Sequence, residues 1–174
     1  MNKPVNAFDY AGQICKALPK GVLLTTKNGE KVNSMTIGWG HIGVEWRRPV
    51  FIVYVRESRF TKEQLEANGE FTVNIPMGEI DRNIITTCGT KSGRELDKAK
   101  ELGLTLVESQ HISVPGIKEL PLTLECKVIF KQDQPLSLIS QDIQEPFYPK
   151  DENGRQDPHT AYYGEIVGAY LIED

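Results

Sequence analysis

The sequence predicts a mainly β protein with helical inserts, in the α+β class, built around an antiparallel barrel. Short runs rich in valine, isoleucine, threonine and aromatic residues recur along the chain. Glycine, proline or asparagine bounds most of these runs, which is typical of strands joined by turns. The helical segments do not alternate regularly with the strands, which disfavours a parallel sheet with crossover helices.

The composition limits the class of protein and its partners. A chain of 174 residues is long enough for one domain with its own core, so we expect a single domain over residues 1–174. The formal net charge of −4 argues against nucleic acid as the main partner. The sequence shows neither an apolar run as long as a membrane span nor a signal peptide. We therefore expect no membrane contact and a cytoplasmic location.

The cysteine and histidine residues are scattered along the chain. Cys15, Cys88 and Cys126 form no C-x-x-C pattern, which indicates free thiols in a reducing compartment rather than a disulfide framework. The three histidines are equally far apart. The sequence therefore predicts no metal site.

The first third of the chain predicts a helical lead-in, a hairpin and a buried strand. Residues 1–20 contain a short amphipathic helix, Asp9–Leu18, which Pro19 stops. The pair Asn28-Gly29 is a strong hairpin signal between two strands. The strands expected in this part are Val22–Thr26, Val32–Gly38 and Val50–Val55.

The rest of the chain predicts three helices and three strands. Thr61 with Gln64, and Ser92 with Glu95, have the spacing of a capping box, which marks a helix start. The expected helices are Thr61–Asn68, Glu79–Cys88 and Ser92–Leu102, each followed by glycine. The expected strands are Phe71–Ile75, Leu122–Lys131 and Tyr162–Ile172. Residues 132–158, rich in polar residues and proline, predict a long loop, a lid or a partner-binding arm.

The run Lys31–Trp46 is the most informative stretch. Its first half reads as a strand, but neither face of that strand is cleanly apolar. Asparagine, serine, threonine and glycine there suit a surface that receives a flat ligand with hydrogen-bonding edges, because glycine lets the backbone come close. Trp39 offers a ring face for stacking.

One motif within this run is misleading. Gly38–Gly43 fits the dinucleotide pattern G-x-G-x-x-G, which has meaning only where a helix begins inside it. Here Pro49 and an apolar strand follow, and they leave no room for a crossover helix. We therefore reject a dinucleotide-binding interpretation.

Two further segments are candidate anion sites. Ser58–Thr61 places two hydroxyls and a guanidinium at a helix start, with Arg56 nearby, and a phosphate or a merely capped helix explains it equally well. Cys88–Arg94 resembles a phosphate loop, but Thr90 stands where a Walker A loop has glycine, so its spacing favours an exposed turn. Cys88 lies at the C-terminal end of a predicted helix, where the dipole does not lower its pKa, and we expect an inert buried thiol.

Catalytic side chains are harder to assign. His159 is a candidate general acid, although a polar group that faces a ligand or a loop is the simpler interpretation. The sequence contains no Ser/His/Asp set or carboxylate pair at an interpretable spacing, so hydrolysis has no support.

Taken in order, these segments resemble the flavin reductase-like family, and within it the flavoredoxin branch. The matching pieces are Val32–Trp39, Arg56–Thr61 with Leu65, Phe71–Ile75, Cys88–Arg94 with Asp97-Lys98, Leu122–Cys126 and His159–Tyr170. Members of the family bind FMN on a split β-barrel. The resemblance therefore implies an FMN-binding split barrel of antiparallel Greek-key type.

The resemblance also implies roles for particular residues. The strand and turn lie along the isoalloxazine ring, the helix start holds the phosphate, and the Gly89–Ser92 turn approaches the N1–O2 side of the ring. A cation such as Lys91 would stabilise the negative charge of a reduced flavin and raise its potential. The implied cofactor-binding residues are Asn33, Ser34, Met35, Thr36, Ile37, Gly38, Trp39, Arg56, Ser58, Arg59, Thr61, Cys88, Gly89, Thr90, Lys91, Ser92 and His159.

The leading functional interpretation is an FMN-containing oxidoreductase, either a flavin reductase or a flavoredoxin-like electron carrier. The resemblance implies a homodimer with FMN at or near the subunit interface, and NADH, NADPH or a protein as electron donor. Residues 132–158 look longer than the usual connection in the family. Two alternatives stay open: an FMN carrier or sensor without NAD(P)H turnover, and a cofactor-free barrel that binds a partner protein through residues 132–158.

Overall fold

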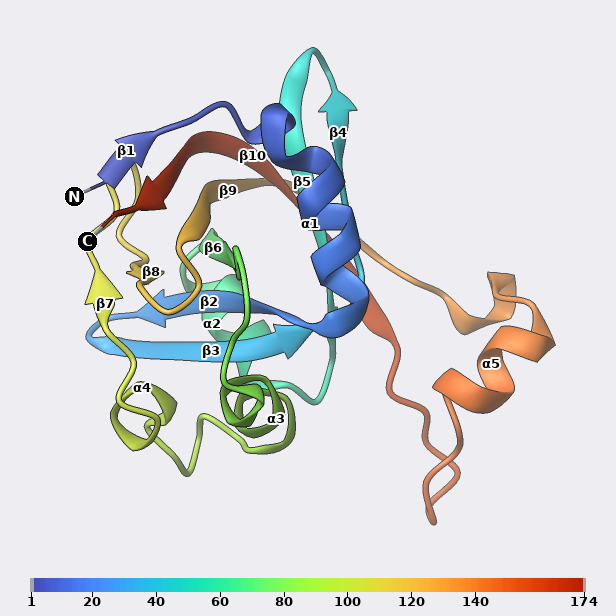
Figure 1. Ribbon diagram of the computed structural model, residues 1–174. Coiled ribbons are helices and arrows are strands. Elements are labelled where there is room, and N and C mark those ends of the chain that lie inside the picture. Colours follow the sequence, from blue (N-terminus) through green and yellow to red (C-terminus); the bar gives the residue numbers. More distant parts are fainter. Residues whose placement is uncertain (1, 174) are drawn as a thin grey trace.

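The strands form one strongly curved antiparallel sheet in the computed structural model, which describes residues 2–173 (Figure 1). Within residues 2–173 this sheet has eight strands in the order β3-β2-β6-β9-β10-β5-β4, with β1 paired to β10. The strands are β1 (Asn2–Pro4), β2 (Val22–Asn28), β3 (Lys31–Ile37), β4 (Gly40–Glu45), β5 (Arg48–Arg56), β6 (Glu70–Ile75), β9 (Leu122–Asp133) and β10 (His159–Ile172). The predicted fold class is confirmed.

The helices are short and lie around the barrel rather than between its strands. They are α1 (Ala11–Ala17), α2 (Phe60–Ala67), α3 (Arg82–Thr90), α4 (Lys98–Glu101) and α5 (Gln141–Phe147), with 3-10 turns η1 (Ala7–Tyr10), η2 (Leu18–Lys20) and η3 (Leu136–Leu138). A separate pair of short strands joins β7 (Leu106–Val107) to β8 (Gly116–Ile117). In Figure 1, α3 and α4 lie beneath β3, and α5 projects away from the barrel. No helix formed by residues 2–173 is long and apolar enough to cross a membrane.

Strands β3 and β4 are the two ends of the sheet, although only Gly38 and Trp39 separate them in the chain. Within the described residues, the outer edge of β3 therefore pairs with no strand. Strand β4 was missed from the sequence, where its glycines hid the pattern. It forms a hairpin with β5 through Trp46 and Arg47, whose φ angles are 51° and 59°. A strand rather than a helix follows Gly38, which confirms that the dinucleotide motif is misleading.

The core has two parts, one inside the barrel and one under α3. Met35 and Ile37 of β3 point into the barrel and are buried there beside residues such as Leu24 and Phe71. Helix α3 packs on the other face of β3, where the hydroxyl of Thr36 donates a hydrogen bond of 2.6 Å to the carbonyl of Ile85. Asn33 shares the face of Met35 and Ile37 and bonds to Thr61 of α2, so neither face of the strand is purely apolar, as the sequence predicted. Helix α3 covers the face that carries Thr36.

Both predicted capping boxes are wrong. Helix α2 begins at Phe60, before Thr61, and Thr61 is buried instead of capping it. Its hydroxyl accepts a hydrogen bond of 3.0 Å from the amide of Asn33. Gln64 is also buried, and accepts one of 2.6 Å from the hydroxyl of Thr26. These side chains attach the helix to the sheet, and a pattern of local spacing does not reveal such tertiary bonds.

The second helix start is displaced by several residues. Helix α4 begins at Lys98, with Asp97 as the N-cap that accepts from the backbone N–H of Lys100 at 3.1 Å. Ser92 instead accepts from the N–H of Arg94 at 3.2 Å, which forms a local turn rather than a helix cap. The residues from 92 to 97 are therefore a loop that faces the sheet edge.

Two other expected boundaries also differ. Helix α3 begins at Arg82, after the N-cap Asp81, and continues through Gly89, which was expected to end it. Residues 132–158 are not one loop, because β9 extends to Asp133 and α5 follows. Pro146 lies inside α5, and proline in this position explains why the sequence did not predict a helix there.

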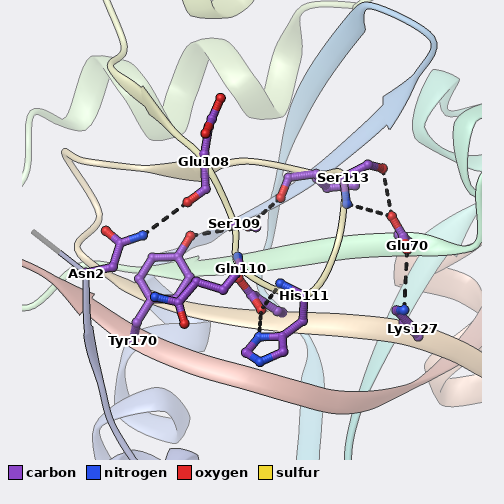
Figure 2. Close-up of polar contacts among 11 residues, drawn as sticks. Asn2, Glu70, Glu108, Ser109, Gln110, His111, Ser113, Lys127 and Tyr170 are labelled. Atoms are coloured by element: carbon purple, nitrogen blue, oxygen red, sulfur yellow. Dashed lines mark hydrogen bonds and ion pairs between the residues drawn. The ribbon is translucent and has the colours of Figure 1, made fainter.

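Two carboxylates attach the loop between β7 and β8 to the sheet (Figure 2). Glu125 of β9 has a fully buried side chain and accepts from the backbone N–H groups of Gln110 and His111 at 2.6 and 3.1 Å. It also contacts Nδ1 of His111 at 2.6 Å. Glu70 accepts from the N–H and the hydroxyl of Ser113 at 2.8 and 2.7 Å. These bonds satisfy the buried charge of Glu125 and fix the loop.

The substitution Glu125→Gln tests the weight of this contact. The amide keeps the shape but loses the negative charge, and its NH₂ group faces donors, so hydrogen bonds to a charged acceptor are lost. We expect the free energy of unfolding in urea to fall by about 2–3 kcal/mol. Glu165→Gln, which removes an exposed ion pair with Arg48, is the matched control and should cost less than about 1 kcal/mol. Equal losses in the two variants would contradict the assignment.

Candidate functional site

A cleft of about 460 Å³ opens where β3 ends, beside the unpaired edge of the strand. Its walls come from β3 and the bend after it, from β5, from the start of α2, from α3 and from the start of β10. The residues that line it are Met35, Thr36, Ile37, Gly38, Trp39, Tyr54, Arg56, Ser58, Arg59, Gly89, Asp157 and His159.

A smaller cavity of about 150 Å³ adjoins the cleft and shares Met35, Ser58 and Arg59 with it. Its other lining residues are Asn33, Phe60, Thr61, Thr90, Lys91, Ser92, Gly93, Arg94 and Lys98. Segments that are far apart in the sequence therefore meet at one place. Their roles toward a ligand remain predictions, but their convergence is a property of the fold.

Ser34 and Cys88 are the predicted site residues that line neither cavity. The hydroxyl of Ser34 instead shares a hydrogen bond of 2.8 Å with that of Thr25 in the sheet. Cys88 is fully buried, and burial raises the pKa of its thiol, with Lys98 acting in the opposite direction. Cys88 is thus an inert thiol by its surroundings, as the sequence suggested. The backbone carbonyls of both residues accept hydrogen bonds from Nζ of Lys98, which lines the small cavity.

Lys98 is the residue that connects the sheet edge to the helices. Its side chain is buried, with the residue 4% exposed, and Nζ donates to the carbonyls of Ser34 and Cys88 at 2.8 and 3.2 Å. Burial lowers the pKa of Lys98 to about 8, the Cys88 thiol opposes this and Arg59 adds to it. No carboxylate among residues 2–173 pairs with Lys98 in the structure. A buried cation without a counter-ion, at the wall of a cavity, is suited to an anionic ligand.

The start of α2 presents a guanidinium between the two cavities. Arg59 is the N-cap residue, and its Nη2 donates to the carbonyl of Gly89 at 2.7 Å. Burial lowers the pKa of Arg59, Arg56 lowers it further, and Asp157 opposes both. Asp157 also accepts from the backbone N–H and the hydroxyl of Ser58 at 3.0 and 2.5 Å. Ser58 is therefore held in place, with its hydroxyl already engaged.

The wall of the small cavity contains an unsatisfied acceptor. Oδ1 of Asn33 is buried and has no hydrogen-bond partner within the described residues, while its Nδ2 donates to Thr61. Gly93 lies directly against it, since a Cβ at that position would stand 2.1 Å from Oδ1. Arg94 continues this wall with a hydrogen bond of 3.2 Å to the carbonyl of Ser58 and an ion pair with Glu63.

Aromatic side chains gather at the other end of the cleft. The ring of Trp39, 43% exposed, lies 4.9 Å from that of His159 and 5.3 Å from that of Phe147. Nδ1 of His159 shares a hydrogen bond of 2.8 Å with the hydroxyl of Tyr148. Burial lowers the pKa of His159 to about 4, Arg56 lowers it further, and Asp157 opposes this. The imidazole is neutral near pH 7, which argues against a charged general acid and favours a polar group that faces a ligand.

Four residues that were not predicted as site residues line the two cavities: Tyr54 and Asp157 in the cleft, Arg94 and Lys98 in the small cavity. Lys98 and Arg94 were part of matched segments, and their charge was the available signal. Asp157 immediately precedes Pro158 and His159, so its neighbourhood was marked as well. No local pattern distinguishes Tyr54 from the other residues of a buried strand.

The arrangement suits a ligand with two different ends. One end of the site offers a strand edge and aromatic rings, which accommodate a flat molecule that forms hydrogen bonds. The other end presents Arg59, Lys91, Arg94 and Lys98, which accommodate an anion. Among the described residues, no group of three or more His, Cys, Asp or Glu side chains is placed to hold a metal ion.

Known proteins provide an independent comparison. The family model described as flavin reductase like domain matches residues 16–174 of this chain. An uncharacterised protein of Archaeoglobus fulgidus is 35% identical over 125 residues, which cover 72% of this chain and 66% of that protein. The match thus spans just under two thirds of the length of this relative.

Solved structures share the fold. Flavoredoxin from Methanosarcina acetivorans superposes with a TM-score of 0.66 at 27% identity, covering 88% of this chain and 68% of that one. An FMN-binding domain of a flavin reductase-like enzyme from Shewanella baltica gives 0.65 at 17% identity, covering 98% and 77%. At this lower identity, the second comparison shows the fold alone.

Lys98→Met tests the buried cation through the pH dependence of stability. The folded-state pKa of about 8 lies below the ordinary value of 10.5, so below pH 8 the cost of burying the charge is fully present. Between these values the folded state loses its proton before the unfolded chain does, and the free energy of unfolding rises with pH. Relative to Lys98→Met, the wild type should gain at most about 1.4 kcal/mol per pH unit over this interval.

Urea unfolding at several values between pH 7 and pH 10.5 provides the measurement. Lys100→Met changes an exposed lysine of the same helix, and its curve should run parallel to that of the wild type. A constant difference between the wild type and Lys98→Met across the interval would show that Lys98 is not buried as a cation.

Proposed function

The chain belongs to the flavin reductase-like family, and from this membership we propose that it binds FMN and acts as an FMN-dependent oxidoreductase of the flavin reductase or flavoredoxin type. Membership confirms the resemblance stated from the sequence and supports a flavin-related function. The observation that carries the proposal is the pair of adjoining cavities, one beside a strand edge and aromatic rings, the other surrounded by cations. FMN has the same two-part form, a flat ring and a terminal phosphate.

The small cavity has the donors that a phosphate monoester needs. A phosphate of this kind carries a charge of about −1.5 to −2 at pH 7 and several strong acceptor oxygens. Arg59, Arg94 and Lys98 are placed around the cavity, and Lys91 lies at its exposed side. The phosphate would give Lys98 the counter-ion that the protein does not provide. Thr90 and Ser92 add hydroxyls to the same wall.

The edge of β3 has the main-chain groups that a flavin ring needs. The carbonyl of Ser34 accepts a hydrogen bond from Lys98, so the backbone N–H and carbonyl of Ser34 point away from β2, toward the open edge of the sheet. Because backbone direction alternates along an antiparallel strand, the N–H and carbonyl of Thr36 face the same open side. The pyrimidine part of isoalloxazine presents both acceptors and a donor, so this edge fits it. The fit supports FMN as the ligand.

When bound, FMN supplies a centre that accepts electrons from a donor and passes them on. The chain itself contributes binding and orientation: Trp39 and His159 shape the ring end, and Arg59, which bonds to the carbonyl of Gly89, presents its charge at the phosphate end. As electron donor we propose NAD(P)H or a redox protein. Steady-state NAD(P)H oxidation by the FMN-loaded protein, with and without added free flavin, tests turnover. A bound flavin that no nicotinamide reduces would favour the carrier or sensor alternative.

We further propose a homodimer in the cytoplasm. Trp39 and Phe147 leave apolar rings exposed beside the cleft, and a second chain would cover them. Sedimentation of the FMN-loaded protein at micromolar concentration should show a dimer, and a monomer alone would count heavily against it. The three cysteines are free, which is consistent with a reducing compartment.

Arg59→Ala tests the phosphate end. Loss of a hydrogen bond to a charged group costs about 1.5–3 kcal/mol, so the affinity for FMN should fall by about tenfold or more. Riboflavin lacks the phosphate and should bind the wild type and the variant about equally. Titration of the FMN-free protein, followed by flavin fluorescence, gives both constants.

Arg48→Ala is the matched control, because Arg48 lies at the far end of β5 in an ion pair with Glu165. It should leave both affinities unchanged. Equal losses of FMN and riboflavin affinity in Arg59→Ala would place the phosphate elsewhere.

A further inference from the structure

A third cavity, of about 620 Å³, lies between the barrel and the segment from Gln134 to Tyr148, which we call the arm. Its barrel side is formed by Trp39, His41 and Tyr54. Trp39 and Tyr54 also line the cleft proposed for FMN, so the two spaces adjoin. A molecule in this cavity would lie next to one in the cleft.

The arm presents apolar side chains to this cavity. Leu138, Ile139 and Ile143 line it, and Leu138 is 82% exposed. A leucine this exposed leaves apolar surface in water, and burial of that surface against a ligand is favourable. Together with Ile143, which is 45% exposed, it forms an apolar wall that a ligand would cover.

This wall is fixed to the barrel rather than free to move as a loop. Nη2 of Arg56 donates to the carbonyl of Phe147 at 2.8 Å, at the end of α5. Tyr148 is buried and bonded to His159 at 2.8 Å. Within the arm, Nε2 of Gln144 donates to two backbone carbonyls at 2.8 and 2.6 Å. The cavity is therefore preformed, as ligand sites usually are.

A polar pair stands on the barrel side, opposite the apolar wall. The hydroxyl of Tyr54 and Nδ1 of His41 are 3.1 Å apart. If Nδ1 carries the proton, the Tyr54 hydroxyl is free to donate, and if Tyr54 donates to Nδ1, the Nε2–H of His41 is free. Burial raises the pKa of Tyr54, and Tyr163 raises it further, so the hydroxyl keeps its proton. In either form the pair offers one donor, which matches a carbonyl oxygen.

We propose that this cavity binds a small, flat, apolar molecule with a ring carbonyl, of the quinone class, beside the cofactor cleft. The inference rests on the proposed function and deepens it, because it names the class of molecule that meets the cofactor. Two features select a small ligand over a second chain: the volume is that of a ligand site, and the polar pair lines the same space as the apolar wall. The apolar wall selects against a charged or strongly polar molecule.

Duroquinone is a suitable probe because its fully substituted ring does not readily add the exposed thiol of Cys15. Its binding is measured by calorimetry on the FMN-loaded and the FMN-free protein. Ile143→Glu places a charge on the apolar wall at an exposed position, and should lower the affinity for duroquinone at least tenfold. Tyr54→Phe removes the hydroxyl of the polar pair and should lower it by about threefold to tenfold.

Ile129→Glu is the matched control, since Ile129 is a half-exposed residue of β9 outside the cavity. It should change the duroquinone affinity less than twofold, and FMN affinity should be equal in the wild type, Ile143→Glu and Ile129→Glu. Saturable binding with this pattern supports the inference.

Three results would overturn it: no saturable duroquinone binding to the wild type, equal binding to Ile143→Glu, or a dimer that Ile143→Glu dissociates without changing the quinone affinity. The last would assign the wall to a second copy. Since FMN binding is measured separately, FMN that binds without duroquinone leaves the proposed function standing. Duroquinone binding without FMN binding would reject that function alone.

Discussion

The open edge of β3 is the constraint on which the rest of the structure depends. An edge strand leaves N–H and carbonyl groups that water, another strand or side chains must satisfy. Within residues 2–173, helices rather than a strand cover part of this edge. Nζ of Lys98 donates to the edge carbonyl of Ser34, and the side-chain hydroxyl of Thr36 donates to the carbonyl of Ile85, which holds α3 against the strand. Beyond Thr36 the edge runs into the cleft, where the proposed flavin ring would complete it.

The same edge explains where the cations gather. Lys98 of α4 bonds to the carbonyl of Ser34 in β3, and Arg94 bonds to the carbonyl of Ser58. The segment from residue 90 to residue 98 therefore lies against the start of α2. Arg59 crosses between these parts and bonds to Gly89. The result is a group of cations with few nearby carboxylates, which is unfavourable in the free protein and favourable once an anion is present. The pKa of Lys98 is lowered to about 8 chiefly by burial, and the nearby Arg59 lowers it further.

Much of the site could be predicted because its signals are local. The run Asn33–Trp39 and the segment Ser58–Thr61 carry their chemistry in adjacent residues, and the structure places both at the cleft. The capping boxes were wrong because Thr61 and Gln64 form bonds with the sheet, which spacing along the chain does not reveal. The burial of Lys98 was likewise unpredictable, because it depends on two carbonyls that are 10 and 64 residues away in sequence. Helix α5 was hidden by its proline and by the lack of a buried face.

The most direct test of the central claim is the identity and amount of the chromophore that the protein holds. The purified protein is incubated with excess FMN, desalted and denatured, and the released compound is identified by mass spectrometry and quantified against protein. The account predicts FMN at close to one molecule per chain. A colourless protein that releases no flavin after this treatment would contradict it.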